Sequence, residues 1–238
     1  MNFIKSNDHI LVEFEDGYYV VDTGSPFSFN FYGANWVVIN GNEFCISSTI
    51  PPLVNQNAIE ELVGVPVVGF IGMDILKHTN LTVDFENEEI LFGVPEAEDK
   101  HGYCIVTLKE MLGEIVYTED LMIGGKRVKA IIDTGAIYSY VAGSFANVFE
   151  ITAETLVDYN PEVGEIKSDI YKGRLSIYNS PIGYEVDVKV GIMPPVFELL
   201  GMDAIVGINV LSEKCIFFDF SENILGIKPD ERCKRALS

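Results

Sequence analysis

The fold is decided by a short motif that occurs twice, VVDTGS at Val20–Ser25 and IIDTGA at Ile131–Ala136. Each copy is an Asp-Thr-Gly triplet that follows two β-branched residues, as a loop follows a strand. One such triplet carries little weight, since a chain of this length contains one by chance in roughly one case in twenty. It would then be an ordinary turn, in which glycine adopts a conformation that other residues avoid. Two copies in the same apolar setting require a common explanation.

Two further landmarks repeat in the same order after each motif. FIGMDIL at Phe70–Leu76 has its counterpart in IVGINVL at Ile205–Leu211, and TVDF at Thr82–Phe85 has its counterpart in FFDF at Phe217–Phe220. The interval between the first two landmarks is longer in the second copy. A repeat of this length is too long for a solenoid, and it indicates a duplicated unit with an insertion in its second copy.

The repeat divides the chain into two lobes and a linker. We expect an N-terminal lobe at 1–94 and a C-terminal lobe at 103–230, joined by a polar linker without periodicity at 95–102. Most segments of both lobes are apolar or alternating runs bounded by Gly, Asn or Asp, which predict strands. The clearest is a hairpin at 36–46, whose Asn40-Gly41 pair suits a type I′ turn. The predicted class is all-β with a few short helices.

The first motif resembles the active-site loop of pepsin-like aspartic peptidases, and the second resembles the form found in retropepsins. The segments around Gly72 and Gly207 are similar to the strand that threads beside that loop in both families. The resemblance covers most of the chain, at roughly 10–93 and 103–228. It implies a bilobal pepsin-like fold, in which one chain carries two related, retropepsin-like and β-barrel-like lobes.

The implied reaction is peptide hydrolysis by Asp22 and Asp133. Two carboxyl groups about 3 Å apart cannot both ionise, so they share one proton and act together as base and acid. This close approach requires loops without a Cβ, which Gly24 and Gly135 provide. We expect Gly72 and Gly207 to let the threading strand pass close to each loop for the same reason.

The resemblance implies further site residues around this dyad. The catalytic set is Asp22, Asp133, Thr23, Gly24, Thr134 and Gly135, and the substrate-binding set is Ser25, Ala136 and Tyr159. Thr23 and Thr134 are expected to exchange hydroxyl hydrogen bonds with the backbone of the opposite loop. Ser25 is expected to donate its hydroxyl to Asp22, which favours the charged form of Asp22. Since Ala136 has no hydroxyl, Asp133 is expected to hold the shared proton.

The flap that closes a pepsin-like cleft has two candidates in this sequence. The hairpin at Asn40-Gly41 lies in the first lobe, as in pepsin-like enzymes, but that lobe is short between its landmarks. The insertion in the second lobe carries turn residues at Asp158–Gly164, and Tyr159 within it would cover the dyad. An ordinary structural hairpin remains the alternative at both places.

Other polar residues are assigned structural roles. Asp74 and Asn209 follow a glycine and precede a short helical stretch, which they are expected to cap. Asp84 and Asp219 begin hairpin turns and are expected to stabilise them.

Charge and composition limit the partners. The net charge of −20 and the pI near 4.4 disfavour nucleic acid and anionic membranes as partners. The resemblance to aspartic peptidases implies a peptide or an unfolded protein as the partner. The four cysteines lack CxxC spacing and the three histidines lack ligand spacing, so we expect no metal and no cofactor. No apolar leader opens the sequence, and we expect a cytoplasmic protein. Because both motifs lie in one chain, we expect a monomer.

Three other functions remain open at this stage. One is a catalytically silent peptide-binding protein that keeps the aspartic peptidase fold. Another is a glycosidase, whose two carboxyl groups would lie at least about 5 Å apart. The third is a metal site built on the same carboxylates, for which the sequence offers no further convergent ligands.

Overall fold

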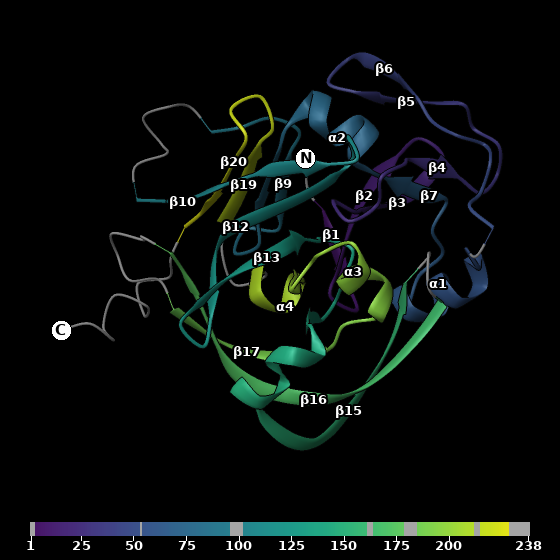
Figure 1. Cartoon of the computed structure of the whole chain (residues 1–238). Coiled ribbons are helices and arrows are strands. Elements are labelled where there is room, and N and C mark those ends of the chain that lie inside the picture. The colour runs from purple at the N-terminus through teal and green to yellow at the C-terminus, as the bar shows by residue number, and fades with distance from the viewer. Residues whose placement is uncertain are drawn as a thin grey trace.

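A computed structural model describes residues 3–52, 54–95, 102–160, 164–178, 185–211 and 215–228. Most of these residues lie in β-strands that form two lobes and a sheet between them (Figure 1). The predicted all-β, bilobal class is confirmed. Of the predicted linker, 96–101 lies outside the described residues.

The sheet of the first lobe brings the first two landmarks together. Its five strands are, in spatial order, β1 (Ile4–Ser6), β2 (His9–Phe14), β3 (Gly17–Val21), β7 (Gly69–Ile71) and β4 (Phe29–Asn30). Strands β3 and β7 are parallel, with Val21 opposite Ile71. Both strands end at the same edge, so the Asp22 loop starts beside the Gly72 segment.

The sheet of the second lobe repeats this arrangement on a larger scale. Its eight strands are, in order, β11 (Lys109–Met111), β12 (Ile115–Ile123), β13 (Lys126–Ile132), β18 (Ala204–Val206), β14 (Ser139–Val141), β17 (Glu185–Ile192), β16 (Gly164–Ile177) and β15 (Glu150–Asn160). Strands β13 and β18 are parallel, as β3 and β7 are. A further pairing of β12 with β16 curls the sheet toward a barrel. The insertion predicted for the second copy is the long β15–β16 hairpin together with β17.

A third sheet joins the lobes. Its order is β10 (Cys104–Thr107), β20 (Ile224–Ile227), β19 (Cys215–Asp219), β8 (Leu81–Asp84) and β9 (Glu89–Leu91). The third landmarks pair with each other here, because β8 and β19 are antiparallel with Thr82 opposite Phe217. Asp84 and Asp219 accept hydrogen bonds within the turns that follow, which confirms their structural role.

The predicted hairpin of the first lobe forms its own small sheet from β5 (Trp36–Ile39) and β6 (Asn42–Cys45). Asn40 and Gly41 both have positive φ, at 52° and 77°, as a type I′ turn requires. The hairpin prediction is confirmed.

Helical segments are short and lie between strands. They are α1 (Gln56–Val63), α2 (Met73–Thr79), η1 (Gly143–Val148), α3 (Pro195–Leu199) and α4 (Ile208–Leu211). Asn55 caps α1 through its side-chain oxygen, and Gly64 ends the helix at φ 85°. In the described part of the chain, no helix combines the length and apolarity needed to cross a bilayer.

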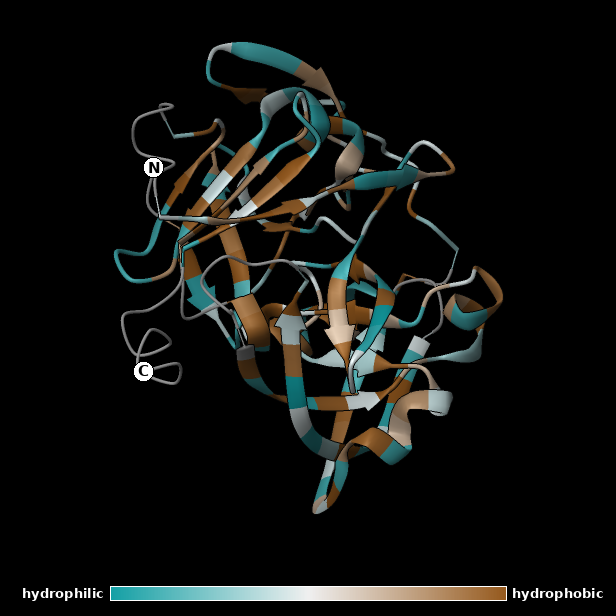
Figure 2. Cartoon of the chain, turned by 60° about the vertical axis from the view of Figure 1, so that its left-hand side comes forward, coloured by the Kyte–Doolittle hydropathy of each residue, from teal (hydrophilic) through white to brown (hydrophobic). Residues whose placement is uncertain are grey.

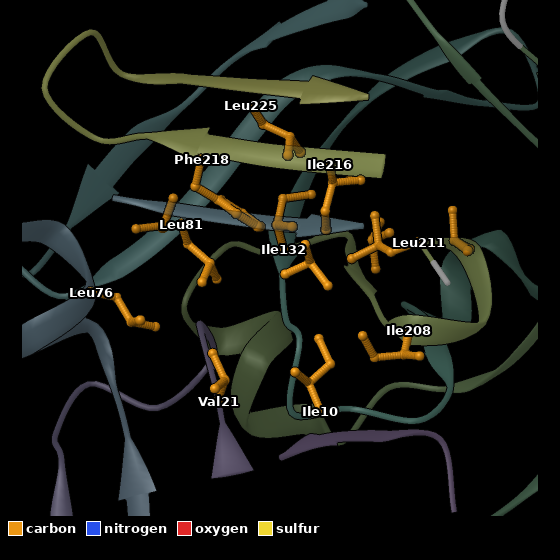
Figure 3. Close-up of a cluster of buried hydrophobic side chains, with 14 of the residues drawn as sticks. Ile10, Val21, Leu76, Leu81, Ile132, Ile208, Leu211, Ile216, Phe218 and Leu225 are labelled. Atoms are coloured by element: carbon orange, nitrogen blue, oxygen red, sulfur yellow. The ribbon is translucent and has the colours of Figure 1, made fainter. Parts of the chain in front are cut away.

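The largest hydrophobic cluster runs through both lobes and the joining sheet. Hydrophobic residues occupy the strands of both lobes (Figure 2), and many of them meet in this cluster (Figure 3). Val21 and Ile132, which directly precede the two aspartates, are both buried in it. One continuous core therefore fixes the two loops relative to each other, with about 1.5–3 kcal/mol from each large apolar side chain that it buries.

Candidate active site

Asp22 and Asp133 face each other, and each is enclosed by the opposite loop. A Cβ placed on Gly24 would lie 2.3 Å from Cγ of Asp133, and a Cβ on Gly135 would lie 2.3 Å from Cγ of Asp22. No side chain fits in that space, so glycine is required by close approach rather than by backbone conformation. The two carboxyl groups are hydrogen-bonded to each other.

Backbone N–H groups orient both carboxyl groups. In the first loop, Gly24 and Ser25 donate to Asp22 Oδ1 at 2.8 and 2.9 Å. In the second loop, the two residues after Thr134 donate to Asp133 Oδ1 at 2.9 and 3.0 Å. This pattern leaves both carboxyl groups turned toward the space between the lobes.

The two threonines lock the loops together. Thr23 N donates to Thr134 Oγ1 at 3.0 Å, and Thr134 N donates to Thr23 Oγ1 at 3.0 Å. Thr23 Oγ1 donates to Ile132 O at 2.8 Å, and Thr134 Oγ1 donates to Val21 O at 2.9 Å. Both side chains are buried, so the bonds are shielded from water. The expected exchange of hydrogen bonds is confirmed.

The threading strands pass as closely as their glycines predict. A Cβ on Gly72 would lie 2.7 Å from the carbonyl oxygens of Ser25 and Phe27. A Cβ on Gly207 would lie 2.6 Å from the carbonyl oxygen of Ala136 and 2.5 Å from that of Tyr138. Each loop is therefore held from below by backbone contact.

A serine supports each loop, and sequence reasoning missed both. Ser28 Oγ donates to Asp74 Oδ1 at 2.6 Å and accepts from Gly72 N at 2.8 Å. Ser139 Oγ donates to Asn209 Oδ1 at 2.7 Å, and it accepts from the N–H of Gly207 at 3.0 Å. The two serines follow the two aspartates at the same offset, which is the signal that would have found them.

The same contacts correct the capping role expected for Asp74 and Asn209. The N-cap of α2 is Gly72, and no side chain caps that helix. Asp74 bonds to Ser28 instead, and Asn209 bonds to Ser139 and to the carbonyl oxygen of Lys189. Both side chains connect the threading segment to the loop.

The hydroxyl of Ser25 does not act as expected. Ser25 Oγ donates to the carbonyl oxygen of Phe27 at 2.9 Å, and the backbone N–H of Ser25 donates to Asp22. The proposed cause of asymmetry between the aspartates is therefore wrong. The expectation that Asp133 holds the shared proton still stands, because burial, and then the charge of Asp22, raise the pKa of Asp133 well above the ordinary value.

A cavity of about 170 Å³ opens above the dyad between the lobes. Both aspartates line it, and so do the three residues predicted to bind substrate, Ser25, Ala136 and Tyr159. Its apolar walls include Phe27, Phe29, Pro51, Ile166, Phe197 and Ile205. The cavity can therefore take an apolar group directly against the carboxyl groups.

The hairpin that covers this cavity comes from the second lobe. Strands β15 and β16 extend as a long ribbon toward α1 of the first lobe (Figure 1), and Tyr159 lies on the cavity wall. The hydroxyl of Tyr159 accepts a hydrogen bond from Asn55 N at 3.1 Å, so the ribbon is tied across the cleft. The other flap candidate is wrong, since no residue of β5 or β6 lines the cavity. The predicted turn at Asp158–Gly164 is wrong at its ends, because 158–160 belong to β15 and Gly164 begins β16, while 161–163 lie outside the described residues.

Comparison with known proteins finds similar structures but no matching sequence family. No protein-family model matches the chain, and no curated protein sequence matches it. Among solved structures, the chain is similar to the crystal structure of basic 7S globulin from soybean, with a TM-score of 0.51 and 11% identity. The match covers 95% of this chain and 90% of that one. It shows the fold alone.

Two further residues of the cleft were not predicted. Asp158 and Tyr140 line the cavity beside the dyad, and Tyr140 Oη donates to Asp158 Oδ2 at 2.5 Å. Burial raises the pKa of both groups, and for Tyr140 the neighbouring Asp158 raises it further. His9 lies close to this pair, and burial lowers its pKa. The described residues hold no group of three or more His, Cys, Asp or Glu side chains with the geometry of a metal site.

Proposed function

We propose that this chain is an aspartic endopeptidase, in which Asp22 and Asp133 activate a water for attack on a peptide carbonyl. The observation that carries the proposal is the reciprocal contact of each carboxyl group with the glycine of the opposite loop. That contact places two carboxyl groups within hydrogen-bonding distance, and the raised pKa of Asp133 supports a proton shared between them.

The reaction follows from this protonation state. Ionised Asp22 takes a proton from the water while protonated Asp133 donates its proton to the carbonyl oxygen, giving a tetrahedral diol. The carbon–nitrogen bond then breaks as one carboxyl group protonates the amine nitrogen and the other removes a proton from the diol. The products are a carboxylic acid and an amine, and the dyad again holds one proton.

The same geometry argues against a glycosidase. Retaining glycosidases keep their carboxyl groups about 5 to 5.5 Å apart, and inverting enzymes keep them farther apart. Carboxyl groups that bond to each other directly leave no room for a sugar ring and a water between them.

A silent peptide-binding protein is the second candidate, and the closed cleft favours it. A cavity of about 170 Å³ is smaller than the roughly 300–1,000 Å³ of ordinary ligand sites. The β15–β16 hairpin must therefore move away from Asn55 before an extended peptide can enter. A chain whose hairpin opens enough to admit a peptide, but not enough for the peptide bond to reach the dyad, would bind the peptide without cleaving it.

The setting we propose follows from the same residues. Both loops lie in one chain, so a monomer suffices, and the partner is a peptide or an unfolded segment of a protein. Cys45 and Cys215 are free thiols, which fits a reducing compartment such as the cytoplasm.

Cleavage of a denatured basic protein tests the proposal directly. We expect fragments to appear over time, and we expect a statine-type peptide to stop the reaction, because its hydroxyl takes the place of the attacking water. A metal chelator at the same concentration is the control and should leave the rate unchanged. Absence of cleavage across mildly acidic and neutral pH would favour the silent binding protein.

The pH profile gives a second test. Activity needs a singly protonated dyad, so the rate should follow a bell whose two limbs belong to the pair. Because burial, and then the charge of Asp22, raise the pKa of Asp133, the alkaline limb should lie well above the pKa of about 3.9 of an ordinary Asp. Ala136→Ser is the control. Since the hydroxyl of Ser25 turns to a carbonyl oxygen, the new hydroxyl should do the same and leave this limb in place. An alkaline limb at the ordinary Asp value of about 3.9 would contradict the raised pKa.

A further inference from the structure

A third carboxyl group lies in the cleft, and the proposed reaction gives it no role. Asp158 on β15 is only 5% exposed, and it lines the same cavity as the dyad. Its Oδ2 accepts from the Tyr140 hydroxyl, and its Oδ1 accepts from its neighbour's backbone N–H at 2.8 Å. These bonds fix the direction of the carboxyl group against the cavity wall.

This carboxyl group has hydrogen-bond donors but no cationic side chain bonded to it. None of the ion pairs among the described residues involves Asp158. The nearby histidine, His9, has a pKa lowered by burial, so it is a poor counter-ion at neutral pH. A buried carboxylate without a cation lowers stability, and buried titratable groups of this kind, when they line a cleft, cluster at functional sites.

The surroundings of Asp158 match one kind of substrate side chain. Ile166 from the hairpin and Phe197 and Ile205 from the second lobe give the cavity apolar walls. Lysine and arginine place long aliphatic stems along apolar surfaces while their charged heads reach an acidic partner. The cavity volume of about 170 Å³ suits one large side chain rather than an extended ligand.

We propose that Asp158 forms a subsite for a lysine or arginine side chain of the substrate, next to the bond that is cleaved. The stem packs against the apolar walls, and the cationic head pairs with the Asp158 carboxylate. This inference rests on the proposed peptidase function for the position of the peptide. The binding preference itself does not depend on cleavage.

The test compares peptides that differ at one residue, lysine against norleucine, which has the same stem without the amine. Two such pairs of peptides are made. One pair varies the residue before the cleaved bond, and the other varies the residue after it. Binding is measured at neutral pH by fluorescence anisotropy on the Asp133→Asn protein, and cleavage is measured on the otherwise unmodified protein. At one of the two positions, we expect lysine to bind roughly 10- to 100-fold more tightly, the range for a hydrogen bond to a charged group.

Two variants test whether the preference for lysine depends on Asp158. Asp158→Asn keeps an acceptor for Tyr140 but removes the charge. It should bring the ratio of the dissociation constants of the two peptides close to one. Asp169→Asn makes the same change at an exposed position on β16 and should keep the full ratio. Equal binding of the two peptides by the protein with Asp158 intact would overturn the inference, and this comparison stands even if Asp158→Asn does not fold. Full retention of the preference in folded Asp158→Asn would also overturn it.

The outcomes separate this inference from the proposed function. A lysine preference in binding without any cleavage supports the subsite and rejects the peptidase. Cleavage without a lysine preference supports the peptidase and rejects the subsite.

Discussion

Asp22→Asn and Asp133→Asn are each expected to lower kcat/KM by at least about a thousandfold, the upper part of the range for positioned acid–base groups. Asn at 22 cannot take the proton from water, and Asn at 133 cannot hold the proton that polarises the carbonyl. Because the two residues act as one unit, the double variant should be no less active than either single variant. The measurement is the rate of cleavage of one peptide at its optimal pH by all three variants.

Thermal unfolding is the control that separates lost chemistry from lost structure. The backbone N–H groups that orient Asp133 can donate to an Asn side-chain oxygen in the same place, so Asp133→Asn should fold. The folded-state pKa of Asp133 is raised above the unfolded value of about 3.9. Its stabilising contribution is therefore complete below the unfolded pKa and is lost as the pH rises through the folded pKa. At neutral pH, Asp133→Asn should melt at or above the temperature of the unmodified protein, and the advantage should shrink in acid.

Either of two results would contradict this account of the dyad. One is substantial cleavage by a single variant, which would place the chemistry elsewhere. The other concerns the difference in melting temperature between Asp133→Asn and the unmodified protein. If this difference were less favourable to the variant at neutral pH than at acidic pH, the pKa of Asp133 would not be raised.

The site was predictable where a short motif repeats. The two Asp-Thr-Gly triplets and the two glycine landmarks identified the dyad, the threonine exchange and the threading strands, because backbone packing this close tolerates few residue types. Ser28 and Ser139 belong to the same repeat. Serine is common in turns, so its repeated offset carries information only after the other landmarks have been aligned.

The remaining features depend on contacts that no local pattern encodes. Local turn residues identified two possible hairpins, but only the tertiary bond between Tyr159 and Asn55 distinguishes the one that covers the cavity. The hydroxyl of Ser25 was expected to bond to Asp22, but it bonds to the carbonyl oxygen of Phe27. The choice between them is set by a rotamer that the residue type does not determine. Asp158 lies in the cleft because the β15–β16 ribbon reaches toward α1 of the first lobe, and strand alternation alone does not predict that placement.

Gly24→Ala is expected to be almost as damaging as loss of an aspartate, although it removes no functional group. The added methyl would lie 2.3 Å from Cγ of Asp133 and 2.4 Å from both of its carboxyl oxygens. The carboxyl group is held in place by two backbone N–H groups, so it cannot move aside without losing hydrogen bonds. The loops must separate instead, and a displacement of about 1 Å at reacting groups can cost a hundredfold in rate. Overpacking of this kind should also lower the free energy of unfolding by about 1–3 kcal/mol.

Gly143→Ala is the matched control, because a Cβ there meets nothing within 4 Å and the residue has no positive φ. Peptide cleavage and urea unfolding are measured for both variants. The control should keep the kcat/KM and the unfolding midpoint of the unmodified protein, while Gly24→Ala loses about a hundredfold or more in kcat/KM and remains folded. Gly135→Ala should match Gly24→Ala, since its methyl would meet Asp22 at the same 2.3 Å. If Gly24→Ala cleaved as fast as the control, the carboxyl groups would not need this contact. Close packing of the two loops would then not be what holds the two acids in position for catalysis.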